Sequence, residues 1–93
     1  MVVGVISWEL HLEGCSSLKQ KRAILRSLKD RLRDRHKVSV AETDHQNTWQ
    51  QAELSAAIVS SDRRQAQALL DRVDAFVASD AGVRIVDSAV IFY

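Results

Sequence analysis

The sequence contains no proline, three glycines and one cysteine among its 93 residues. The absence of proline and the scarcity of glycine argue against a flexible linker or a low-complexity segment. A lone cysteine cannot form an intrachain disulfide, so we expect a reducing compartment, the cytoplasm. No apolar run approaches the roughly 20 residues that a membrane-spanning helix needs, so we expect no membrane partner.

The length and the hydrophobic content of the chain suffice for one folded domain. Hydrophobic residues make up 46% of the chain, and 93 residues leave room for a single core. We therefore expect one domain over residues 1–93. The first residues enter an apolar segment without the basic region of a secretory signal, which again favours the cytoplasm.

Hydrophobic periodicity predicts the element order β-α-β-β-α-β. Alternating apolar residues predict strands over residues 2–12, 38–42, 49–59 and 83–93. Helical spacing predicts one helix from near Ser17, where Gln20 completes a capping box, and a second from Ser61 or Asp62 to a stop at Gly82.

This order is that of the ferredoxin-like α+β plait, with two helices on one face of a four-stranded antiparallel sheet in the order 4-1-3-2. The other face of the sheet stays uncovered within one chain. Val3, Val5, Ala57, Val59 and part of the last strand are expected to leave an apolar patch there. Such patches often mark interfaces, so a homodimer through this face is one expectation.

Charge is distributed very unevenly along the chain. Residues 16–37 contain nine of the thirteen Lys and Arg residues but only two acids, Asp30 and Asp34, a local charge of +7. The rest of the chain carries −6. A net charge of +1 hides this separation.

Helical periodicity gathers part of this charge on one flank. Spacings of three and four residues place five cations beside a buried stripe of Leu18, Ile24, Leu25, Leu28 and Leu32. These cations, named here the basic ridge, are Lys19, Arg22, Arg26, Lys29 and Arg33. Lys21, Arg31 and Arg35 are expected to add charge on the opposite shoulder. The ridge could follow a phosphate backbone, or it could be a solvated flank whose stems cover the edge of the core.

Several segments of the sequence resemble the YlxP-like family of small bacterial proteins, which has no established activity. The segments are Glu9-Leu10-His11-Leu12, Ser17-Leu18-Lys19-Gln20-Lys21-Arg22 and Val38-Ser39-Val40-Ala41-Glu42, followed by Asp44 and Trp49. The resemblance spans essentially the whole chain and implies the same ferredoxin-like plait. The genes of that family tend to lie beside those of translation initiation and ribosome-binding factors, which implies a role near the ribosome. The family often has an acid where this chain has Asn47.

Other candidate sites are weaker, and each has an ordinary structural explanation. Gly14, Cys15, Ser16 and Ser17 could hold a phosphate at the helix start, but a capped helix explains them equally well. Cys15 has no partner that would make it a nucleophile. Glu42, Asp44 and His45 could bind a metal, but a polar hairpin is the simpler interpretation. His11 and His36 are isolated. Trp49 is expected to pack across the sheet edge rather than to stack on a ligand.

We therefore expect a non-enzymatic accessory protein that binds RNA or a ribonucleoprotein, ribosomal RNA or a ribosomal subunit among them, without cofactor, metal or catalytic residues. The expected RNA-binding residues are Lys19, Lys21, Arg22, Arg26, Lys29 and Arg33. Few aromatics are available for the sheet stacking of an RRM, so backbone or shape recognition is expected. The alternative is a homo-oligomeric module using the open sheet face. An acylphosphatase-type enzyme is disfavoured, because its phosphate loop and positioned Asn are missing.

Overall fold

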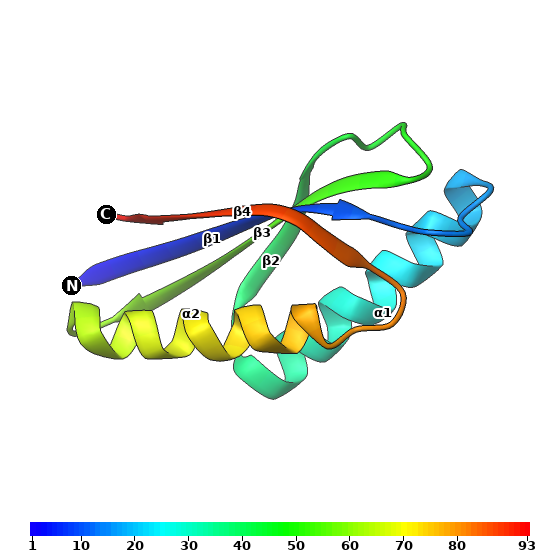
Figure 1. Cartoon of the computed structure of the whole chain (residues 1–93). Helices are drawn as coiled ribbons and strands as arrows, with labels where there is room; N and C mark the ends of the chain where they lie inside the picture. Colours follow the sequence, from blue (N-terminus) through cyan, green and yellow to red (C-terminus); the bar gives the residue numbers. More distant parts are fainter.

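A computed structural model describes every residue from Met1 to Tyr93 and contains six elements (Figure 1). They are β1 (Val2–His11), α1 (Leu18–His36), β2 (Ser39–Asp44), β3 (Gln51–Ser60), α2 (Arg63–Ala78) and β4 (Arg84–Phe92). The sheet order is β2-β3-β1-β4, every neighbouring pair is antiparallel, and both helices lie on one face. The predicted ferredoxin-like plait is confirmed. No helix is long and apolar enough to cross a membrane.

The core lies between the sheet and the two helices. Alternate residues of β1 and β3, such as Trp8 and Leu54, point toward the helices and are fully buried, because successive side chains of a strand face opposite ways. Helix α1 packs on β2 and α2, while α2 packs on β1, β3 and β4. This arrangement leaves one flank of α1 turned away from α2, at the β2 edge.

Both helices begin with a polar cap, as expected. The Ser17 side chain accepts a hydrogen bond from the Gln20 backbone N–H, and the Asp62 side chain accepts one from that of Gln65. Asp62, not Ser61, therefore caps α2. The expected capping box is shifted by one residue, because the Gln20 side chain accepts from the backbone N–H of Ser16.

The β2–β3 hairpin differs most from the expectation. Strand β2 continues to Asp44 and β3 begins only at Gln51, so residues 45–50 form the connection. The pairing of β2 with β3 shifts between Glu42 and Asp44, which indicates a bulge at this end of the sheet edge. Trp49, predicted as the first residue of the third strand, lies in the connection instead.

Candidate nucleic-acid interface

The orientation of α1 is fixed by a buried stripe and by polar contacts on its two flanks. Leu25, Leu28 and Leu32 are buried against the sheet. On the flank facing α2, Arg31 Nη2 lies 2.6 Å from Asp80 Oδ2. On the opposite flank, Arg33 Nη2 donates to the Val40 carbonyl of edge strand β2 at 2.8 Å. The basic ridge therefore lies along the β2 side of the helix.

Four of the five ridge residues have no partner within the protein. Lys19, Arg22 and Arg26 are exposed, Lys29 is half-buried, and none lies within 4.0 Å of an acid. None of the four side chains makes a hydrogen bond, unlike Arg33. The protein thus leaves four cations unpaired on one flank although it contains twelve acids.

Lys21 does not belong to this surface, and its prediction as an RNA contact is wrong. Its side chain is 1% exposed, and its Nζ lies 2.8 Å from Glu42 Oε2. The same ammonium donates to the carbonyl oxygens of His45 and Thr48, at 2.5 and 2.7 Å. A cation with three internal oxygen partners has no donor left for a ligand. Lys21 instead joins α1 to the β2–β3 connection.

The opposite shoulder of α1 is also engaged within the protein. Besides the ion pair of Arg31 with Asp80, the guanidinium groups of Arg31 and Arg35 lie 5.7 and 5.5 Å from the centre of the Phe76 ring. His36 packs edge-on against the same ring, 5.1 Å away. These contacts seat α1 on α2 and leave the ridge as the free cationic surface of the helix.

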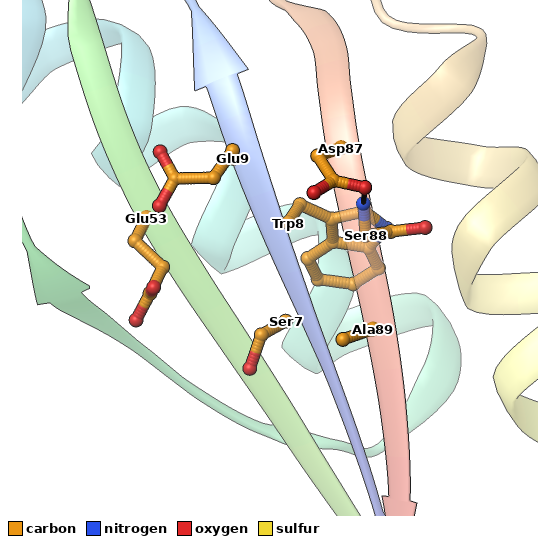
Figure 2. A pocket seen from close by; sticks show the side chains of 7 residues that line it. All are labelled: Ser7, Trp8, Glu9, Glu53, Asp87, Ser88 and Ala89. Atoms are coloured by element: carbon orange, nitrogen blue, oxygen red, sulfur yellow. Dashed lines mark hydrogen bonds between the residues drawn. The ribbon is translucent and has the colours of Figure 1, made fainter.

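The open face of the sheet has the opposite charge at one end. The pairing register places Glu9 of β1 directly across from Glu53 of β3 and from Asp87 of β4 (Figure 2). These carboxylates line a cavity of about 190 Å³. Like charges in register repel one another, and the His45 ring lies beside them with its Nε2 3.0 Å from Glu9 Oε2. This end of the open sheet face is therefore negatively charged.

The weaker candidate sites do not assemble. Glu42 points inward to Lys21 while His45 turns to Glu9, and no group of three or more His, Cys, Asp or Glu side chains is arranged to hold a metal ion. Cys15 is buried, and its thiol donates to the Ser17 carbonyl at 3.4 Å. The hydroxyls of Ser16 and Ser17 are occupied by Gln20. Both hydroxyls at the helix start are thus engaged within the protein.

The position of Trp49 differs from the one predicted from the sequence. Its side chain is 51% exposed and lies in the connection, outside the third strand. The connection is tied to the start of α1 on both sides of Trp49, by the Thr48 carbonyl and by a hydrogen bond from Gln50 Nε2 to the Cys15 carbonyl at 3.4 Å. An exposed indole therefore stands on a held loop beside the first turn of α1.

Comparisons with known proteins agree with this fold. The family described as "Protein of unknown function (DUF503)" matches residues 3–90. The uncharacterized protein YlxP of Bacillus subtilis (strain 168) is 37% identical over 78 residues, which span 84% of this chain and 85% of that protein. Among solved structures, the de novo designed protein Foldit4 has a TM-score of 0.56 at 16% identity, covering 99% of this chain and 94% of its own.

A second solved structure carries the same fold. It is a dimeric protein of unknown function and ferredoxin-like fold from Bacteroides fragilis, with a TM-score of 0.51 at 12% identity, covering 99% of this chain and 94% of its own. At such identities the solved structures share the fold alone. The family match and the relative in Bacillus confirm the resemblance found in the sequence. The chain belongs to the DUF503 family of proteins of unknown function and is related to YlxP of Bacillus subtilis.

Proposed function

We propose that this protein is a non-enzymatic, cytoplasmic accessory factor of the ribosome that binds RNA or a ribonucleoprotein through the basic ridge of α1. The observation that carries the proposal is the set of four unpaired cations, Lys19, Arg22, Arg26 and Lys29. Phosphate neutralisation by Lys and Arg supplies most of the affinity of sequence-independent nucleic-acid binding.

The spacing of the ridge suits a phosphate backbone. From Lys19 to Lys29 the helix rises about 15 Å, so successive cations stand about 5 Å apart. Arg33 continues the row at its far end, with its side chain 47% exposed. The acids of the open sheet face, Glu9, Glu53 and Asp87, lie on the other side of the sheet from both helices. Because the acids and the basic ridge lie on opposite sides of the sheet, the electric field of the protein directs a polyanion toward α1.

A solvated flank selected only for stability is a poorer explanation of the same residues. Every neighbouring pair along the ridge is like-charged at i,i+3 or i,i+4, beginning with Lys19 and Arg22 and then Arg22 and Arg26. Each such pair destabilises a helix by about 0.2–0.5 kcal/mol. Only Asp30 offers relief, 3.5 Å from Arg33. Because these like-charged pairs lower stability, stability alone does not explain the ridge, and a binding role does.

The test compares charge reversals on the two helices. The variant K19E/R22E/R26E/K29E should lose binding to a fluorescein-labelled 20-nucleotide RNA and should no longer sediment with purified ribosomal subunits. The pair R22E/R26E has a matched control in R64E/R72E on α2, because all four arginines are exposed and none has an ion-pair partner. Both pairs change the net charge by −4.

Circular dichroism should show that every variant keeps its secondary structure. R22E/R26E should weaken RNA binding far more than R64E/R72E. If the fourfold variant binds RNA and ribosomal subunits as wild type does, the proposal is wrong. If the two pairs weaken binding equally, net charge and not the ridge is responsible.

A second candidate function rests on the other face of the sheet. At the end away from Glu9, the open face carries an apolar patch formed by six side chains in register: Val3, Val5, Ala57, Val59, Ile91 and Tyr93. Val59, Ile91 and Tyr93 are 68%, 52% and 74% exposed. A second copy of the chain is the occupant that fits best. In a dimer with its two-fold axis across the strands, the apolar patches of the two copies would pack together. Their acidic ends, which repel each other, would point outward.

So small a patch supports only a weak dimer, because stable interfaces bury about 800 Å² per partner. Sedimentation equilibrium should therefore show a dimer that grows with concentration in the high micromolar range. Val59→Glu should abolish it. Val86→Glu should not, because Val86 is equally exposed but lies at the pairing irregularity of β4, away from the patch. A strict monomer at high micromolar concentration would exclude this function.

A further inference from the structure

We infer that Trp49 and the basic ridge together form a site for a single-stranded polynucleotide, in which an unpaired base stacks on the indole while the phosphates follow α1. This inference rests on the proposed function and names its substrate class. It starts from the contrast between the two tryptophans. Trp8 is fully buried and donates its indole N–H to Asp74 at 2.8 Å, whereas Trp49 is half exposed and makes no hydrogen bond.

The loop that carries Trp49 is held in place rather than loosely exposed. Lys21 binds the carbonyls of His45 and Thr48, and Gln50 is bound through both its side chain and its carbonyl, which accepts from the Leu12 N–H at 2.9 Å. A pre-ordered aromatic gives contact area at a small entropic cost when a ligand binds. The half-exposed indole is therefore held in a fixed position where a ligand can reach it.

The same contacts place Trp49 at one end of the ridge. The Thr48 carbonyl, one residue before Trp49, is 2.7 Å from Lys21 Nζ, and Lys21 lies in the helix turn between Lys19 and Arg22. The loop that carries Trp49 thus lies beside the first turns of α1, where the ridge begins. From there the ridge runs about 15 Å along the helix.

The chemistry of the loop suits a nucleobase. Residues 46–50 contain no acid, and they supply the side-chain amides of Gln46 and Asn47, both exposed and free of internal hydrogen bonds. Amide groups can pair with base edges, and indole rings stack on any base face. A duplex keeps its bases stacked inside, so only an unpaired strand can use Trp49 and the ridge together.

The test measures binding of the full chain to two probes, a 12-nucleotide oligo(U) strand and a 12-base-pair RNA duplex. Oligo(U) should quench the emission of Trp49, since buried Trp8 is shielded. Trp49→Leu should weaken oligo(U) binding about 5- to 150-fold, which corresponds to the loss of one stacked base, and leave duplex binding unchanged. Tyr93→Leu removes an even more exposed aromatic, at the far end of the sheet from the ridge, and should change neither. Trp49→Phe should retain most of the oligo(U) affinity.

The outcomes separate this inference from the proposed function. If Trp49→Leu binds oligo(U) as wild type does while K19E/R22E/R26E/K29E does not, the stacking site is refuted and the ridge stands. If the fourfold variant binds both probes as wild type does, the proposed function fails and the inference fails with it. Equal loss of both probes in Trp49→Leu would also refute single-strand selectivity.

Discussion

Lys21 Nζ lies 2.8 Å from Glu42 Oε2 in the interior, where the lysine side chain is 1% and the glutamate side chain 19% exposed. Glu42 Oε2 is buried and has no other polar partner. Lys21, in the most basic segment of the sequence, therefore has a structural role. It holds the β2–β3 connection beside the start of α1.

Replacing this lysine should be costly. Lys21→Met leaves a largely buried carboxylate without its counter-ion and two carbonyl oxygens without their donor, so the free energy of unfolding should fall by about 3 kcal/mol. Urea denaturation measures this change. The matched control Lys19→Met removes an exposed cation of the same helix and should stay within about 0.5 kcal/mol of wild type. The double variant K21M/E42M should recover part of the loss. Equal stability of the two single variants would show that the pair is unimportant.

The buried indole of Trp8 gives a second stability test. Its N–H donates to Asp74 Oδ1 at 2.8 Å and joins β1 to α2. Asp74→Ala leaves a fully buried N–H donor without its partner and removes a hydrogen bond to a charged group. The free energy of unfolding should therefore fall by about 2 kcal/mol. Asp71→Ala, one turn earlier on the exposed side of α2, should cost little. Thermal unfolding of the two variants would contradict the assignment if their midpoints coincided.

Asp80 gives a test that separates the two flanks of α1. Its carboxylate binds Arg31 at 2.6 Å and accepts from the Gly82 N–H at 2.7 Å. Asp80→Ala should lower the free energy of unfolding by about 2 kcal/mol, because both groups lose their partner. RNA affinity should not fall, since the ridge lies on the other flank. Asp34→Ala, which removes an exposed acid of α1, is the control for the added net charge. A loss of RNA affinity in Asp80→Ala alone would place the binding surface between the helices.

Local patterns were enough to predict the fold. Alternation in residues 2–12 and the stripe of Leu25, Leu28 and Leu32 each reflect a periodicity that burial imposes, and the strand order followed from the element order. The ends of β2 and β3 were not predictable in this way. They depend on the bulge near Thr43 and on the tether from Lys21, which are contacts between distant segments.

The error over Lys21 has a specific cause. Its spacing to Leu25, Leu28 and Leu32 is that of a core position, so helical periodicity already placed it inward. The local charge of a segment does not distinguish a buried lysine from an exposed one. Only the position of Glu42 across the sheet edge shows why the ammonium can be buried. The prediction that Trp49 begins the third strand failed for the same reason. The loop that carries Trp49 is held by Lys21, a contact between distant segments.

The measurement that tests the basic ridge most directly is the salt dependence of RNA affinity. If Lys19, Arg22, Arg26 and Lys29 each neutralise one phosphate, the logarithm of the association constant for oligo(U) should fall with the logarithm of salt concentration at a slope of about −3. R22Q/R26Q should make this slope shallower by about 1.4, while R64Q/R72Q should leave it unchanged. A wild-type slope near zero, or the same slope in R22Q/R26Q as in wild type, would contradict the account.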